Sequence, residues 1–496
     1  MKGFIKSHPR LFLFYLFLAV ISLFFHRPVE IVNAVSQTPV EYVKLIIAPA
    51  RICLEPFFGP ICYYARSHNL VTEHLVLFMW LITIFLFKVL RIFWRLQIQL
   101  GKFFKPVPYI ARKLSLTPLF ALIIISLLAF EMFVPLPSNT IQTNTENNIL
   151  IDFRCHTTNS AIGFATIEEQ INWHQRNGFH AFFLTVNPLP ESVDLNSHTY
   201  EKTIYDDQNI VVMFGKVFST NTNLILISSD STNTIVTDSY ENPFNILRKT
   251  GDFVFLANPW KNPMSDIQKY IDFGVDGLEI AKQGKQIAYD RKIFRELVEM
   301  SRNNSLFMLG NTDYYGYGSF CYSWTMFKIE GWSQLNYPQR KQAIYSFLKE
   351  RQVRFSEVLV YNDRPFVSPS LVFITPIIHS INYFRTLNLW QIISWVIWML
   401  LLSLAADFQF IKTIKQKTQN YELGLYGIPG IFLTGFLFVL KGQLHQKALI
   451  FDRGNHILWD WVNIGEFLVW CFGIYSIFLL ILQLYIRIRF RFKKSR

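Results

Sequence analysis

The stretch Asp152-Phe-Arg-Cys-His-Thr-Thr-Asn-Ser160 decides the fold that this sequence predicts. It continues an apolar run that begins at Ile149, and such a run is typical of a buried strand. A carboxylate, an imidazole and hydroxyl groups therefore come together where a strand ends, the usual place for a site in α/β folds. Arg154 adds a permanent positive charge between Asp152 and His156.

Short apolar runs alternate with helical stretches on both sides of this segment. Thr166 and Glu169 have the spacing of a capping box, which predicts the start of a helix. The alternation predicts an α/β layer or barrel with a parallel core. We expect strands at 149–153, 180–186, 210–214, 224–228, 234–238, 253–257, 277–280 and 306–309, and helices at 166–178, 265–273, 286–302 and 338–351.

Six motifs, in order over about 150–320, resemble those of the PHP superfamily, the polymerase and histidinol phosphatase group. After 152–160 come Leu184-Thr-Val-Asn187, Phe214-Gly-Lys-Val217, Ala257-Asn-Pro-Trp260, Gly274-Val-Asp-Gly-Leu-Glu279 and Gly310-Asn-Thr-Asp-Tyr-Tyr-Gly316. The resemblance implies a distorted (β/α)7-type barrel. It also implies metal-dependent phosphoesterase chemistry, in which His and carboxylate ligands hold two or three divalent ions.

The sequence departs from the family at most of the ligand positions. Where the family has His, Asp, His, Glu, His and His, this chain has Arg154, Val186, Asn187, Val217, Asn258 and Tyr315. The resemblance leaves His156 and Asp313 as metal ligands, and two are too few for a catalytic site. We therefore expect no cofactor, or at most one divalent metal (Zn, Mn or Fe). The candidate pocket is Asp152, Arg154, His156, Asn187, Asn258, Asp313 and Tyr315.

Arg154 changes what such a pocket can do. Its guanidinium would repel a metal, and an ion pair with Asp313 would place it where the family holds metal. The same group can bind a phosphate- or carboxylate-bearing ligand. For His156 the alternative is a hydrogen-bonded core histidine. His174, His180 and His198 fall outside the motifs and are expected to be ordinary helix, strand-start or loop residues, and Glu279 is not assigned as a ligand.

Apolar segments flank the predicted barrel on both sides. Of the 496 residues 51% are hydrophobic, and runs near 11–25, 74–94, 117–135, 387–406, 425–441 and 464–486 approach the ~20 residues of a membrane span. We therefore expect transmembrane α-helices in 1–148 and 364–496, about three in each, around a PHP-like domain at 149–363. Cys53 and Cys62 are predicted either to form a disulfide or to stay buried thiols.

The charge is distributed unevenly along the chain. The net charge is +13, but residues 150–363 hold 20 basic and 24 acidic residues, so the remainder carries +17. Basic residues without acids occur at 2–10, 95–116 and 487–496, which predicts that these segments face the cytoplasm and contact anionic lipid. Both termini are then cytoplasmic, the domain is extracytoplasmic, and the membrane is a bacterial inner or plasma membrane. An acidic domain does not favour nucleic acid.

Three functions remain open on this sequence. The first is a non-catalytic binding or scaffolding module in the cell envelope, with the lipid bilayer and other envelope membrane proteins as partners. The second is a metal-dependent phosphoesterase with a remodelled site. The third is a transporter or channel component that the domain regulates, although nearly charge-free, Phe-rich spans offer little of a polar path.

Overall fold

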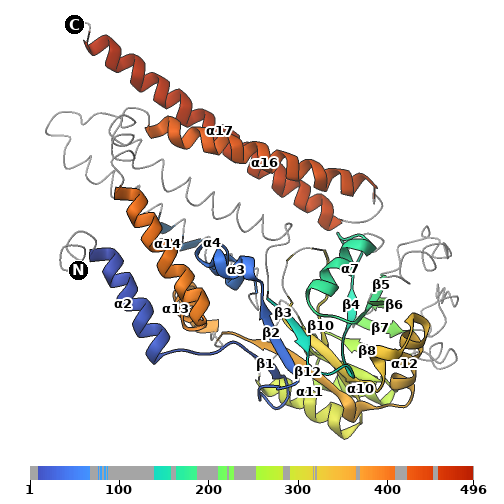
Figure 1. Ribbon diagram of the computed structural model, residues 1–496. Coiled ribbons are helices and arrows are strands. Elements are labelled where there is room, and N and C mark those ends of the chain that lie inside the picture. Colours follow the sequence, from blue (N-terminus) through green and yellow to red (C-terminus); the bar gives the residue numbers. More distant parts are fainter. Residues whose placement is uncertain are drawn as a thin grey trace.

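The computed structural model describes most of the predicted domain and parts of both flanking regions (Figure 1). The described residues are 9–66, 139–157, 163–186, 210–219, 223–227, 253–282, 291–316, 321–364, 369–407, 422–450 and 456–494, together with the isolated positions 76, 79, 80, 83, 84, 87 and 318. Asn187, His198, the strand predicted at 234–238 and the span predicted at 117–135 lie outside these ranges, as does most of 74–94.

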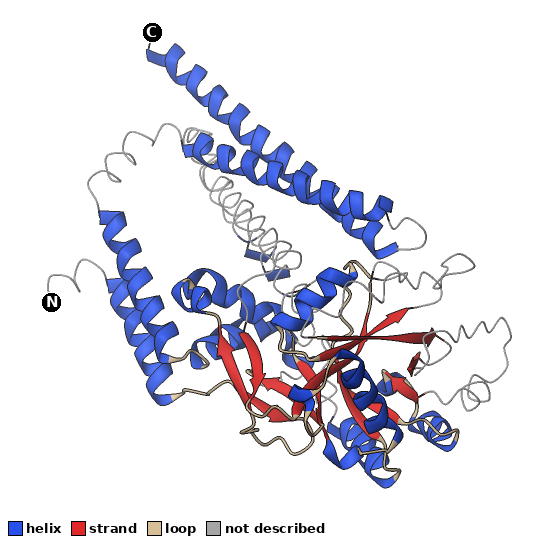
Figure 2. Cartoon of the chain, turned by 45° about the vertical axis from the view of Figure 1, so that its right-hand side comes forward, coloured by secondary structure: helices blue, strands red, loops and turns tan. Residues whose placement is uncertain are grey.

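One curled sheet of ten strands forms the centre of the fold (Figure 2). Its order is β1-β12-β11-β4-β5-β6-β7-β8-β9-β10. The strands are β1 (Glu30–Asn33), β4 (Asn148–Cys155), β5 (Ala181–Val186), β6 (Val211–Ser219), β7 (Asn223–Ile227), β8 (Phe253–Ala257), β9 (Gly277–Lys282), β10 (Phe307–Asn311), β11 (Ser323–Lys328) and β12 (Ser356–Asn362). The α/β prediction is confirmed at this level, as a mixed α/β fold with a curled, barrel-like sheet.

The core of the sheet is not parallel throughout. β4, β5 and β6 are parallel, and so are β8, β9 and β10, but β7 is antiparallel to both of its neighbours. The three residues between β6 and β7 are too few for a parallel crossover. The predicted parallel core is wrong for this strand.

The sheet curls until β10 returns to β4. Cys155 forms an isolated parallel bridge with Tyr314, and the His156 amide donates to the Tyr314 carbonyl at 2.9 Å. Further along, the Asn311 side chain accepts from the Phe153 amide at 3.3 Å. These contacts bring residues 152–157 next to 311–315, so the first and last predicted motifs meet.

Two register shifts determine on which face of the sheet the side chains of the site lie. On β4 the shift falls between Asp152 and Cys155, and on β9 Glu279 pairs with Leu309 whereas Ala281 pairs with Gly310. A bulge adds one residue to a strand and moves later side chains to the other face. Leu150 and Cys155, five residues apart, accordingly pack in the same core cluster.

Helices α7 (Ile167–Arg176), α10 (Met264–Asp272) and α11 (Arg291–Asn303) cover the outer face of the sheet. Helix α12 (Tyr337–Lys349) packs against the core inside the curl. Helix α7 begins with the predicted capping box, in which Thr166 and Glu169 each bond the other's backbone amide. Inside the curl lie stacked rings, among them Phe153 and Phe183 with centroids 5.0 Å apart. The interior is therefore packed with apolar side chains around the base of the site.

Additional elements come from the two flanking regions. They are α2 (Pro9–Phe24), β2 (Val43–Ile47), α3 (Pro49–Cys53), α4 (Glu55–Ala65), β3 (Asn139–Thr143), α13 (Thr375–Arg385), α14 (Leu389–Asp407), α16 (Glu422–Ile450) and α17 (His456–Lys494). β2 and β3 pair as a separate two-stranded sheet, and β1 joins the main sheet beside β12. The sheet thus includes residues before 149, and the predicted domain boundaries stay a prediction.

A membrane span requires a helix that is both long and apolar. Within the described residues, no helix taken alone has both the length and the apolar composition to cross a bilayer. Residues 371–385 and 389–404 meet both criteria only as a pair, and that pair is bent by 107°. Cys53 and Cys62 are free thiols, so the structure favours the unbridged alternative; Cys62 is buried as that alternative expects, whereas Cys53 is exposed.

Candidate functional site

Five ionisable side chains meet at the carboxyl ends of β4, β9 and β10, and we call them the charged cluster. They are Arg154, His156, Glu279, Lys282 and Asp313. Lys282 keeps 15% of its side-chain surface exposed, whereas the other four keep 3% or less. Charges buried to this degree require partners, and each member finds one within the cluster.

Asp313 is the centre of the charged cluster. Its Oδ1 lies 3.0 Å from Arg154 Nε and 3.1 Å from His156 Nε2, and its Oδ2 contacts Lys282 Nζ. Burial alone would raise the pKa of Asp313, but Arg154 and Lys282 hold it well below its usual value. The backbone there is left-handed, with φ 49°. Asp313 is therefore an ionised carboxylate between two protein cations.

Glu279 behaves differently from Asp313. Burial raises the pKa of Glu279 despite Arg154, whose Nη1 lies 4.0 Å from Glu279 Oε2. The Glu279 carboxyl accepts hydrogen bonds from the Asn258 amide at 2.7 Å and the Asn311 side chain at 3.0 Å. The cluster thus contains one strong anion, one carboxyl that resists ionisation, and two cations.

His156 is fixed through both ring nitrogens. Its Nδ1 lies 3.0 Å from the Thr185 carbonyl and its Nε2 lies 3.1 Å from Asp313 Oδ1, so each ring nitrogen faces an oxygen atom. The Tyr315 ring stacks on the imidazole at 5.0 Å, and the Tyr315 hydroxyl donates to Asp313 Oδ2 at 2.6 Å. A carbonyl on Nδ1 is the usual support of a metal-binding histidine. Here that orientation is used to contact a carboxylate.

Arg154 retains unused hydrogen-bonding capacity. Its Nε and Nη1 are buried and have no hydrogen-bond acceptor among the described residues, so the approach to Asp313 is a charge contact without hydrogen-bond geometry. A buried donor left in this state costs roughly 1–3 kcal/mol. Oxygen atoms of a phosphate or carboxylate are the acceptors that a guanidinium binds best.

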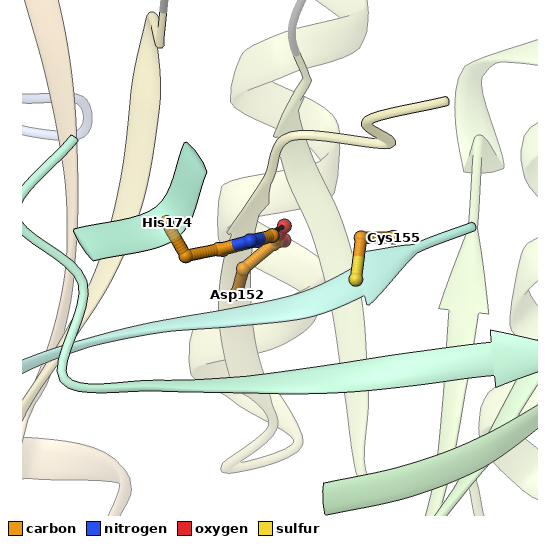
Figure 3. Close-up of side chains that lie close together, drawn as sticks. All are labelled: Asp152, Cys155 and His174. Carbon is orange, nitrogen blue, oxygen red and sulfur yellow. Dashed lines mark hydrogen bonds and ion pairs between the residues drawn. The ribbon is translucent and has the colours of Figure 1, made fainter. Parts of the chain in front are cut away.

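A second buried group lies on the other face of β4, below α7 (Figure 3). Ligand atoms of Asp152, Cys155 and His174 lie within 4.8 Å of one another, so these three could hold a metal ion. Each atom already has a partner, however. Asp152 accepts from the backbone amides of Arg154 and Thr312, from the Thr312 hydroxyl and from His174 Nε2.

The remaining atoms of this second group are engaged as well. His174 Nδ1 lies 2.8 Å from the Gln170 carbonyl, and the Cys155 thiol donates to the Phe183 carbonyl at 3.3 Å. Burial raises the pKa of Cys155 well above its usual value, which disfavours the thiolate that binds metals. A metal here would have to replace hydrogen bonds that hold β4 to α7 and β10.

The structure divides the predicted pocket into two parts. Arg154, His156 and Asp313 come together, and the ion pair expected between Arg154 and Asp313 is present. Tyr315 and Asn258 border the charged cluster, the latter 3.4 Å from Lys282 Nζ. The predicted Asp152 lies apart, in the second group.

Four residues of the two groups lie outside the pocket predicted from the sequence, namely Cys155, His174, Glu279 and Lys282. Lys282 reaches the cluster because the bulge on β9 places it with Glu279, and period-two alternation would have put it on the opposite face. His174 belongs to the buried face of α7 together with Gln170 and Ile171. The capping box and this spacing of three and four residues were the signals that could have placed it inward.

Comparisons with known proteins leave the family unassigned. No protein-family model and no curated protein matches the chain. Among solved structures, a candidate metal-dependent phosphoesterase from Bifidobacterium adolescentis aligns at 12% identity over 34% of this chain and 88% of its own, with a TM-score of 0.27. PsfC from Pseudomonas syringae aligns at 13% identity over 48% and 98%, with a TM-score of 0.29. Likeness at this level carries no argument, and the PHP family stays a prediction from the motifs.

Proposed function

We propose that residues 149–363 form a PHP-like domain, a variant of the (β/α)7-type barrel, that binds an anionic group at Arg154 and Lys282 without catalysing its hydrolysis. The observation that supports this proposal is the pair of cations on Asp313, one at each carboxylate oxygen. The ligand carries a phosphate or a carboxylate, because these groups supply the acceptors that Arg154 does not find within the described parts of the chain.

Electrostatics argues against a catalytic metal in this place. Two unit charges 4 Å apart interact by about 4 kcal/mol at an effective dielectric constant of 20, and a divalent ion doubles this repulsion for each cation. Here Arg154 and Lys282 both lie at Asp313, one of the two remaining ligands. We infer that the chain's own cations have replaced the metals and that the domain is a binding or scaffolding module.

Phosphate titration of the full-length protein tests this proposal. We expect saturable binding by calorimetry, lost in Lys282→Met, which is partly exposed and so the safer change for folding. Lys269→Met removes an exposed cation and should bind normally. Metal analysis of the same sample should find less than one Zn, Mn or Fe per chain. A stoichiometric metal that disappears in His156→Ala or Asp313→Asn would contradict the proposal.

We further propose that the flanking helices hold this domain at the outer side of a bacterial membrane. Large apolar side chains are exposed along α2, α14, α16 and α17, for example Leu13, Trp390, Phe432 and Trp470. Exposed apolar surface of this extent is typical of contact with lipid or with other membrane proteins. A reporter fused after Arg364 should be active on the outer side, and activity in the cytoplasm would refute the orientation.

The second candidate function is a phosphoesterase with a relocated metal. It is favoured by the proximity of Asp152, Cys155 and His174. His174→Gln discriminates between the two functions. A phosphoesterase of this kind would lose both metal and activity in that variant, whereas the anion-binding domain would keep its phosphate affinity.

A further inference from the structure

The C-terminal helices α16 and α17 lie side by side and reach the rim of the site (Figures 1 and 2). We call this pair the hairpin. Lys441 and Glu466 bridge its two helices at 3.2 Å. Leu444 and Ala448 of α16 and Val462 of α17 pack in one buried cluster with Phe164, and Tyr315 and Trp459 lie against it. One end of the hairpin is therefore seated on the domain at the rim of the charged cluster.

Tyr315 contacts both the charged cluster and the apolar cluster under the hairpin. Its hydroxyl bonds Asp313 and its ring stacks on His156, while the same ring packs against the apolar cluster under the hairpin. The Tyr315 carbonyl also accepts from the Phe164 amide at 2.6 Å, so the two rim segments are joined. A shift of Asp313 would consequently move Tyr315 and disturb the packing of the hairpin on the domain.

A polar contact fixes the hairpin at a second point. Lys447 Nζ donates to Glu169 Oε2 at 2.7 Å, and Glu169 also caps α7 through the Thr166 amide. Side chains of Lys447 and Glu169 are 34% and 47% exposed, so this ion pair can break without unfolding the domain. The apolar cluster and the ion pair together seat the hairpin over the end of the barrel where β4 and β10 meet.

We propose that the hairpin is an inhibitory cover on the anion site, and that anion binding and hairpin docking oppose each other through Tyr315. This inference rests on the proposed function. An anion held by Arg154 and Lys282 brings negative charge next to Asp313, which displaces the carboxylate and its hydrogen bond from Tyr315. Because coupling between two sites is reciprocal, the docked hairpin lowers the affinity for the anion by the same factor by which the anion weakens docking.

Two measurements on the full-length protein in detergent test the cover, with inorganic phosphate as the probe. Calorimetry gives the phosphate affinity, and hydrogen exchange of peptides spanning 440–465 gives docking. In the wild type, saturating phosphate should accelerate exchange in these peptides. Lys447→Ala should bind phosphate about two- to fivefold more tightly, the range expected for an exposed ion pair. If Lys447→Ala acted only by removing a positive charge, its phosphate binding would weaken rather than tighten. Lys269→Ala, which also removes an exposed cation, is the matched control.

Tyr315→Phe separates coupling from packing. The variant keeps the ring and the apolar contact but lacks the hydroxyl on Asp313, so phosphate should still bind while the exchange response falls to less than half. An unchanged response in this variant, or weaker phosphate binding in Lys447→Ala, overturns the coupling and leaves the anion site standing. Absence of phosphate binding in the wild type overturns the proposed function and, with it, the cover.

Discussion

Removing Arg154 tests whether the charged cluster is held by the two cations on Asp313. Arg154→Met keeps a long apolar side chain but deletes the guanidinium that lies 3.0 Å from Asp313 and 4.0 Å from Glu279. Breaking a buried pair costs about 3–5 kcal/mol, because the remaining charge stays buried without compensation. Lys282 still contacts Asp313, so we expect the lower end, about 3 kcal/mol.

The double variant supplies the decisive comparison. Arg154→Met/Asp313→Asn removes both charges, and a neutral pair of similar volume avoids the cost of an isolated buried ion. We therefore expect the double variant to lose less stability than the sum of the single variants, with a coupling of about 2 kcal/mol. Lys282 remains without its carboxylate in this variant, so recovery will be incomplete.

Thermal unfolding of the full-length protein, followed by tryptophan fluorescence, measures these differences. For a domain of this size about 3 kcal/mol lowers the midpoint by roughly 6–12 °C. The control cycle uses Lys269→Met and Asp266→Asn, an ion pair 2.8 Å long whose side chains are 68% and 41% exposed, and should show no measurable change. Additive effects in the Arg154–Asp313 cycle, or a shift no larger than in the control, would refute the reasoning.

Three further predictions concern pH and helix packing. Burial, with help from Arg340, lowers the pKa of His180 to about 4 from 6.5, so stability should fall by roughly 3 kcal/mol as pH drops from 6.5 to 4, and denaturant unfolding of His180→Asn should remove this dependence. Burial raises the pKa of Glu279, so the free energy of unfolding of the wild type should fall as pH rises above ~4.3. Glu279→Gln should become more stable relative to the wild type over that range, and the same dependence of stability on pH in both proteins would contradict this. Gly430→Val should make the hairpin protease-sensitive because a β-carbon there would collide with Ser476, whereas Gly435→Val, with open space, should not.

Local sequence signals predicted most of the secondary structure around the site. The capping box at Thr166 and Glu169 begins a helix as expected, because its two reciprocal hydrogen bonds involve residues three apart. The apolar run before Asp152 is a fully buried strand. A strand was predicted where β7 lies, but its antiparallel orientation was not, because β6 continues to Ser219 whereas the predicted strand ended at Phe214. The longer strand leaves a connection too short for a parallel crossover.

The members of the site were harder to predict than the strands that carry them. Period-two alternation assigns faces correctly only while the register is regular, and both strands that supply the cations contain a shift. The ion pair of Arg154 with Asp313 could be anticipated because each residue occupies a motif position. Lys282 has no motif position, and its place depends on a bulge that the sequence does not signal.

The bulge on β4 also divides the side chains of one short stretch between two groups. It sends Asp152 and Cys155 toward α7 and leaves Arg154 and His156 on the side of Asp313. Asp152 fastens β4 to α7 and to the end of β10 through bonds that involve neither the Arg154 side chain nor a metal. A change of the side chain at position 154 therefore leaves these hydrogen bonds of Asp152 in place. The hydrogen bonds of Asp152 join the strand to its neighbours, and the proposed anion site depends on the charges around Asp313.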